Sequence, residues 1–296
     1  PEVSSTPLLR ASPRQGERVM FGTPLRASWD AVLRAFWGIV LRATDKDYPP
    51  IIHLPHSVIS VARYRRWRQQ EGLGSLWLYD TLLSFFAHSQ GGGCQCKALL
   101  EGKSIISYIC RWDFTNFHIV AYCLTYWSPR DLVYRCMVMP RHPARLFCVA
   151  CDAFDSTTST CALVDAAVKL HPHNPVLPAF IGFVMYNTGA AVRWLDERAR
   201  GKHSEPCFLT EPGGAALRGA TLALAYLFIG RRFRDGQFRD RALVTLTALH
   251  VALGVCEDFM EFDLFDGLWR RASKALAPVR DLANALQLGV PPPPHP

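Results

Sequence analysis

Long uncharged apolar stretches, separated by clusters of arginine, constrain the fold of this 296-residue chain more than any other feature. Residues 175–192 contain no charge and reach the roughly 18 residues expected of a stand-alone transmembrane helix. The other uncharged stretches are shorter, so a spanning helix there would have to include a polar residue or end in a basic anchor. The mean hydropathy of +0.05 is, taken alone, ordinary for a soluble protein. The pattern favours an all-α polytopic membrane protein, with a soluble helical protein as the alternative.

Seven apolar segments are predicted to form the membrane domain. The interruptions described below suggest that segments four to six repeat segments one to three. The predicted fold is therefore seven transmembrane helices, arranged as two inverted three-helix repeats plus one. The segments are residues 48–64, 73–99, 114–139, 143–168, 175–195, 215–230 and 242–265.

The placement of positive charge gives a separate indication of orientation. Lysine and arginine are enriched in short cytoplasmic loops. With an external amino end, the loops after segments one, three and five would be cytoplasmic, and they contain the arginines within 63–68, 135–145 and 193–200. The arginine-rich loop 231–241 contradicts the rule. Three loops out of four therefore agree with this topology.

Four regions are predicted along the chain. Residues 1–27 form a basic arm rich in Ser, Pro and Arg, either the remnant of an organellar targeting sequence or a disordered arm. Residues 28–46 have the apolar spacing of an amphipathic interfacial helix. Residues 48–265 form the channel-like membrane domain. Residues 267–296 contain a C-terminal amphipathic helix and a proline-rich tail.

Glycine interrupts two of the segments. Gly91, Gly92 and Gly93 lie in the second, and Gly189 follows Asn187 and Thr188 in the fifth. Glycine costs about 1 kcal/mol relative to alanine inside a helix, so we expect a break at both places. Paired breaks in two halves are typical of an inverted-repeat transporter or channel, whose pathway lies at the repeat interface. The alternative is that the glycines only permit close helix packing.

The fourth segment contains two aspartates, Asp152 and Asp155, on one helix face. Each would cost about 2.5–3.5 kcal/mol at the centre of a lone spanning helix. Such a face must point at a cavity or at a cationic partner. The alternative is that this segment is a solvated helix of a soluble protein.

Enzymatic, metal-binding and nucleic-acid-binding functions are not indicated by the sequence. Cys148 and Cys151 form a lone C-x-x-C pair without the second pair that a zinc site needs. No nucleophile elbow, zinc-protease motif or phosphate-binding loop is present. The net charge of +8 is concentrated at the ends of apolar stretches, which favours an anionic lipid surface over nucleic acid. We expect no cofactor and no catalytic residues.

The third segment carries a more specific signal. An aromatic apolar run is followed by Pro129, Asp131, Leu132, Tyr134 and Arg135 in the order Pro-x-Asp-Leu-x-Tyr-Arg. This stretch resembles the third helix of the trimeric intracellular cation channels. Weaker similarity extends over residues 48–265, in the first segment, the triple glycine and the start of the sixth segment.

The resemblance implies a homotrimer with one pore per subunit, permeation of K⁺ and other monovalent cations, and an intracellular membrane, typically the endoplasmic reticulum. Cys151, Asp152 and Asp155 lie where the family carries a Lys-Glu-Val motif and further basic residues, and we expect these three residues to face the pore. Acidic residues in a pore still favour cations. The missing lysine leaves a second interpretation open. The chain would then be an accessory subunit of a mitochondrial or chloroplast membrane complex that keeps the fold without a pore.

Overall fold

The computed structural model describes residues 50–73, 77–86, 91–102, 112–174, 176–201, 213–232 and 236–265, with a few isolated positions elsewhere. The chain divides into two compact units, Pro1–Ile39 and Val40–Pro296. The predicted arm 1–27 lies outside the described residues. Within the predicted helix 28–46 only Arg34, Ala35 and Gly38 are described, and they are helical. Six positions between 267 and 275 are described in the C-terminal region, also as helix.

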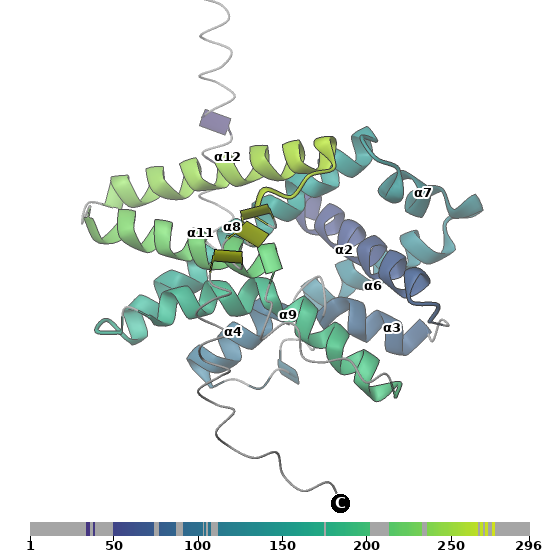
Figure 1. Ribbon diagram of the computed structural model, residues 1–296, viewed down its shortest axis with the longest axis horizontal. Helices are drawn as coiled ribbons and strands as arrows, with labels where there is room; N and C mark the ends of the chain where they lie inside the picture. Colours follow the sequence, from purple (N-terminus) through teal and green to yellow (C-terminus); the bar gives the residue numbers. More distant parts are fainter. Residues whose placement is uncertain are drawn as a thin grey trace, which may run out of the picture. The chain divides into compact units, whose positions relative to one another are not determined.

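The second unit is built from helices, and no strand occurs in the ranges given above. This confirms the all-α class. The helices are α2 (Pro50–Gln70), α3 (Trp77–Ser84), α4 (Gly91–Glu101), α6 (Trp112–Trp127), the 3₁₀ turn η2 (Pro129–Asp131), α7 (Leu132–Val138), α8 (Pro143–Leu170), α9 (Leu177–Ala199), α11 (Gly213–Arg232) and α12 (Gly236–Met260) (Figure 1).

Helix α8 is the central element of this unit. It packs against α2, α4, α9, α11 and α12, while α6 covers the other side of α2 (Figure 1). The helix begins at Pro143, whose missing N–H is no loss in the first turn, and the Nδ1 of His142 accepts a hydrogen bond from the N–H of Ala144 at 3.2 Å. Its buried face mixes apolar residues such as Phe154 and Leu163 with polar ones, which matters for the site.

The predicted segments coincide with helices, but the breaks differ from the prediction. The second segment is divided into α3 and α4, and Gly91, Gly92 and Gly93 form the first turn of α4 instead of interrupting a helix. The break predicted at Gly189 is wrong, because α9 continues without interruption from Leu177 to Ala199. The cost of one glycine inside a 23-residue helix is small compared with the packing on both sides of α9.

Glycine instead allows two close helix crossings. A Cβ on Gly92 would lie 2.2 Å from the carbonyl oxygen of Met185, so α4 and α9 touch backbone to backbone. Gly182 of α9 and Gly219 of α11 meet in the same way, with 2.3 Å between a Cβ at either position and the carbonyl oxygen of the other. These contacts agree with the packing alternative for Gly92.

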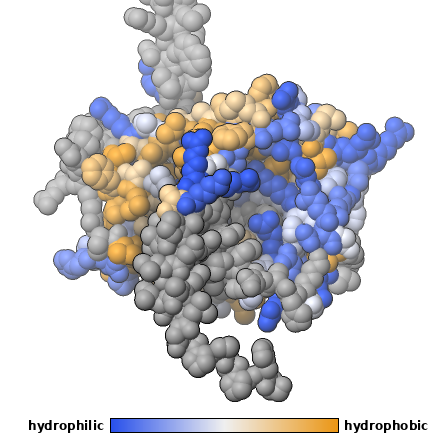
Figure 2. Space-filling view, viewed as in Figure 1, coloured by the Kyte–Doolittle hydropathy of each residue, from blue (hydrophilic) through white to orange (hydrophobic). Residues whose placement is uncertain are grey.

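Large apolar side chains remain exposed on the outer helices. Figure 2 shows hydrophobic surface along α11 and α12, where Leu224, Phe228 and Leu249 are exposed. Within the described residues, Arg239–Met260 is the one helical stretch long and apolar enough to cross a membrane, and Leu217–Ile229 is a shorter apolar stretch. Exposed apolar surface on this scale indicates a lipid or protein neighbour.

The glycine crossing is tested by two adjacent substitutions. Gly92→Ala should lower the free energy of unfolding by about 1–3 kcal/mol, because the new methyl group meets a backbone carbonyl that cannot rotate away. Gly93→Ala is the matched control, since nothing lies within 4 Å of a Cβ there, and it should be neutral or stabilising by up to about 1 kcal/mol. Thermal unfolding of the purified protein measures both. Equal midpoints for the two variants would contradict the close crossing.

Candidate functional site

A polar cavity opens where α2, α8 and α12 come together. Its volume is about 450 Å³, and it is lined from α2, α8, α9, α11 and α12 and from the residues after α12. Four arginines and five carboxylates line it: Arg63, Arg66, Arg145, Arg218, Asp152, Glu257, Asp258, Glu261 and Asp263. The cavity is therefore strongly polar, with a small excess of carboxylates.

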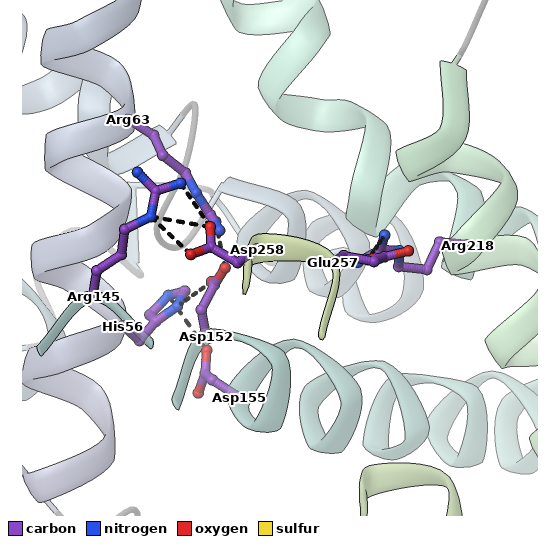
Figure 3. A network of polar contacts seen from close by, with 8 residues as sticks. All are labelled: His56, Arg63, Arg145, Asp152, Asp155, Arg218, Glu257 and Asp258. Carbon is purple, nitrogen blue, oxygen red and sulfur yellow. Dashed lines mark hydrogen bonds and ion pairs between the residues drawn. The ribbon is translucent and has the colours of Figure 1, made fainter. Parts of the chain in front are cut away.

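Two arginines tie the wall of this cavity together (Figure 3). Arg145 at the start of α8 holds Asp258 through Nε and Nη2, at 2.8 and 2.6 Å, and also donates to the carbonyl oxygen of Met137 at 3.0 Å. Arg218 of α11 donates to Glu257 at 2.5 Å and lies 3.4 Å from Asp263. The end of α12 is thus fixed to α8 and α11 by charge-assisted hydrogen bonds, which are stronger than neutral ones.

Two buried polar atoms on the cavity wall have no hydrogen-bond partner among the described residues. They are Nε of Arg218 and Nε2 of His250. Arg218 lies over the ring of Phe265, whose centroid is 6.5 Å from that of His250. Buried groups of this kind need a partner such as water or a ligand, so the cavity suits a hydrated polar occupant.

The inner end of the cavity is closed by a cluster of charged residues from α2 and α8 (Figure 3). The guanidinium of Arg63 pairs with Asp152, and Nδ1 of His56 lies 2.8 Å from the same carboxylate. Nε2 of His56 lies 3.4 Å from Asp155, which Nδ1 of His53 approaches at 3.5 Å. His53, His56 and Asp155 are 4%, 2% and 4% exposed. We call these five residues the His–Asp cluster.

Further polar side chains are buried beyond the cluster. On α8, Thr157 and Thr158 donate to the carbonyl oxygens one turn earlier in the helix. On α9, Thr188 donates to Val184 and lies 3.3 Å from Gln95 of α4. Polar groups are thus buried where α8 and α9 pack together and where α9 meets α4.

The Pro-x-Asp-Leu-x-Tyr stretch binds the side chain of Arg65 from α2. The guanidinium of Arg65 binds Asp131 through both terminal nitrogens, at 3.0 and 2.7 Å, and donates to the carbonyl oxygen of Thr125 at 2.6 Å. It lies 4.0 Å from the centroid of the Tyr134 ring. The hydroxyl of Tyr134 in turn donates to Gln69 at 2.5 Å. The stretch therefore fixes the end of α2 to the turn between α6 and α7.

This turn has an unusual backbone. Arg130 and Asp131 both have positive φ, 55° and 58°, which costs about 1–2 kcal/mol per residue outside glycine. The bidentate contact with Arg65 offsets that cost.

A second group of buried charges lies away from the cavity. Arg68 of α2 is 2.7 Å from Asp80 of α3 and 3.7 Å from Asp196 of α9, and Arg200 binds Asp196 at 2.7 Å. Tyr79 donates to Asp196 at 2.8 Å. These contacts join three helices and close each carboxylate off from solvent, as buried charges require. We interpret this group as structural.

The predicted site residues fall into three groups. Asp152 lines the cavity, Asp155 lies behind it, and Cys151 is buried beside them on α8. Of the family-motif residues, Asp131 and Tyr134 contact Arg65, whereas Pro129, Leu132 and Arg135 are exposed. Of the predicted glycines, Gly92 lies at a helix crossing, and none of the four is among the residues that line this cavity.

The sequence prediction missed the residues that partner the aspartates. A cationic partner was expected for Asp152 and Asp155, and it comes from His53, His56 and Arg63. These three are spaced i, i+3 and i+10, which places them on one face of α2. That spacing was the available signal. Arg145, Arg218 and the carboxylates at the end of α12 gave no comparable pattern.

Within the described residues, no group of three or more histidine, cysteine or acidic side chains is arranged to hold a metal ion. The carboxylates of the cluster already contact imidazole or guanidinium groups. The arrangement can hold water and attract cations at its mouth, and it can bind or release protons at its inner end.

No family model and no curated protein matches the chain. Two solved structures share its fold. A trimeric intracellular cation channel from C. elegans with bound Ca²⁺ aligns with a TM-score of 0.56 and 17% identity, over 78% of this chain and 98% of that chain. Such a channel from C. elegans in the absence of Ca²⁺ aligns with a TM-score of 0.55 and 18% identity, over 78% and 96%. The resemblance inferred from the sequence is thus confirmed at the level of the fold.

The contacts of Arg65 are tested by substituting two neighbouring arginines. Arg65→Lys should lower the free energy of unfolding by about 1–3 kcal/mol, because lysine cannot bind Asp131 bidentately or stack on Tyr134. Arg66→Lys is the control, since Arg66 is exposed at the cavity rim. Thermal unfolding of both variants checks the difference.

The same variants give a pH dependence. The carboxyl of Asp131 can pair with Arg65 only while it is ionised, so this contribution is present above the usual aspartate pKa of about 3.9 and is lost as the pH falls well below it. The difference between wild type and Arg65→Lys should therefore shrink at acidic pH. A difference that stays constant down to pH 2 would contradict the bidentate pair.

Proposed function

We propose that this protein is a channel-like membrane protein that conducts cations through the interior of its helical bundle. The single observation that carries the proposal is the cavity. Within a fold shared with cation channels, a polar space with an excess of carboxylates reaches Asp152, which is half-buried on its wall, and Asp155 lies buried behind it. Buried ionisable groups inside a membrane domain are expensive and typically mark an ion pathway.

The cavity mouth favours positive ions. Glu261 follows α12 and is exposed at the rim, while Asp258 is engaged by Arg145, and Glu257 and Asp263 are engaged by Arg218. A polar recess with excess negative charge raises the local concentration of cations. Asp152 and Asp155 would then meet the ion further inside.

In this proposal the pathway is closed at the inner end of the cavity. The side chains of Arg63 and His56 both contact the carboxylate of Asp152 at the inner end of the cavity. The neighbouring side chains of His53 and Asp155 are buried. A cation that passes this point has to replace the Arg63 contact. Conduction therefore requires α2 to move relative to α8, and Asp152→Asn should reduce the current.

The permeant ion, the oligomeric state, the number of spans and the location are proposed from the resemblance to the cation channels. We propose K⁺ as the main permeant ion, a homotrimer with one pathway per subunit, and seven spanning helices arranged as two inverted repeats plus one. The basic arm, the interfacial helix 28–46 and the helix beginning at Gly267 would lie outside the membrane domain of residues 48–265. An intracellular membrane is the proposed location, with the endoplasmic reticulum favoured by family and anionic lipid as the surrounding surface.

A second function is supported by one specific feature. Four of the five carboxylates that line the cavity are already paired with an arginine, as expected of a fold that has become a scaffold. The protein would then be an accessory subunit of an organellar membrane complex. Native purification distinguishes the two functions, since a scaffold subunit co-purifies with other chains, whereas a channel migrates as a homotrimer.

Conduction is tested in planar bilayers with a variant that reverses one charge at the mouth of the cavity. At about 0.01 M salt, where the Debye length is ~30 Å, Glu261→Lys should lower the cation conductance at least about twofold, and at about 1 M the difference should disappear. Glu71→Lys is the control, because Glu71 is exposed but does not line the cavity. Absence of cation current from the wild-type protein at all voltages would contradict the channel function.

A further inference from the structure

The His–Asp cluster contains an imidazole placed between two carboxylates. His56 lies with Nδ1 2.8 Å from Asp152 and Nε2 3.4 Å from Asp155 (Figure 3). A neutral imidazole carries one N–H, so it can donate to only one of the two carboxylates and presents a lone pair to the other. An imidazolium donates to both. The geometry around His56 therefore matches the protonated ring.

The charge balance of the cluster leads to the same state. Arg63 supplies one positive charge and the two aspartates supply two negative charges, all from side chains at the α2–α8 contact. Without a further proton the cluster would hold an uncompensated carboxylate beside a buried ring. An unpaired buried charge is costly, so the folded state favours one bound proton.

Other ionisable groups near His56 leave this balance unchanged. On α6, His118 donates from Nε2 to the carbonyl oxygen of Thr81, which requires that nitrogen to carry its proton. Further out, α12 places Asp258 on Arg145, and α3 places Asp80 on Arg68. The remaining ionisable groups around the cluster are His53 on α2, the thiols of Cys148 and Cys151 on α8 and the hydroxyl of Tyr186 on α9.

We propose that the His–Asp cluster is a proton-binding site that controls the inner end of the cavity. The bound proton resides on His56 and holds Asp152 and Asp155 of α8 against α2. When the proton leaves, His56 loses one of its two donor contacts, and the buried negative charge pushes the carboxylates apart. The contact between α2 and α8 then weakens where Arg63 and Asp152 close the cavity.

This site adds regulation to the proposed function and rests on it only for its effect on current. If the protein conducts, acidification should close the pathway and alkalinisation should favour opening. The binding of the proton itself requires no conduction. The two ideas can therefore fail separately.

The first measurement is thermal unfolding of the full chain in detergent between pH 5.5 and 8.5. The wild-type midpoint should fall with rising pH by about 2–4 °C more than that of His56→Gln, because glutamine cannot carry a positive charge. Asp155→Asn should lose the same part of the pH dependence, since it mimics a protonated carboxyl. His171→Gln is the control, because His171 is exposed beyond the end of α8. Equal pH dependence in wild type, His56→Gln and Asp155→Asn would overturn the proposal.

A second measurement uses only the wild-type protein, so it does not depend on whether a variant folds. In protein labelled with ¹⁵N-histidine, exposed histidines are neutral at pH 8, well above their usual pKa of about 6.5. The structure leads us to expect one imidazolium signal that persists there. Its absence would overturn the proposal.

Bilayer recordings separate this inference from the proposed function. A current that falls at acidic pH in wild type, but not in His56→Gln, supports both. A pH-dependent midpoint without any current retains the proton site and removes the channel. A current and a midpoint that are both unaffected by His56→Gln retain the channel and remove the proton site.

Discussion

The pairing of α2 with α8 through charged side chains is the constraint on which the rest of the molecule depends. Asp155 lies on the buried face of the central helix and Asp152 lies half-buried beside it at the cavity, where an unmatched carboxylate would be costly. Helix α2 provides the matching groups, with His53 and His56 inside and Arg63 at the cavity. Within the next turn and a half of α2, Arg65 and Arg68 hold the α6–α7 turn and helix α3 by the same kind of contact. One helix thus organises most of the buried charge.

This arrangement reconciles the modest hydropathy of the chain with its fold. Many charged residues that lower the average are neutralised inside the bundle by ion pairs and hydrogen bonds, such as Arg145 with Asp258 and Arg68 with Asp80. The outer faces of α11 and α12 remain apolar. Within the described residues, α12 contains the one stretch long and apolar enough to cross a membrane, and α11 contains a shorter apolar stretch.

Much of the helical organisation could be predicted from the sequence, because apolar stretches and their bounds are local properties. Helix α8 was expected at 143–168 and is observed at Pro143–Leu170. The requirement for a cation opposite Asp152 was also predictable, since burial of a carboxylate has a known cost. Its identity was not, because it depends on which helix packs against α8, and this is decided by contacts between residues about 90 positions apart in the chain.

The glycines show the opposite case. A row of three was expected to break a helix, but a helix can begin within such a row, and Gly92 is needed because α9 approaches so closely. Intrinsic propensity is a weak guide where tertiary packing decides. The Pro-x-Asp-Leu-x-Tyr stretch could be recognised without its role being evident, since Arg65 lies more than sixty residues earlier in the chain.

The most direct test of the α2–α8 pairing is a double-mutant cycle on Arg63 and Asp152. The free energy of unfolding is measured for wild type, Arg63→Ala, Asp152→Ala and the double variant. A coupling energy of about 1–3 kcal/mol is expected, because each single variant leaves a charge without its partner. Additive effects, within about 0.5 kcal/mol, would contradict the claim that this pair holds the two helices together.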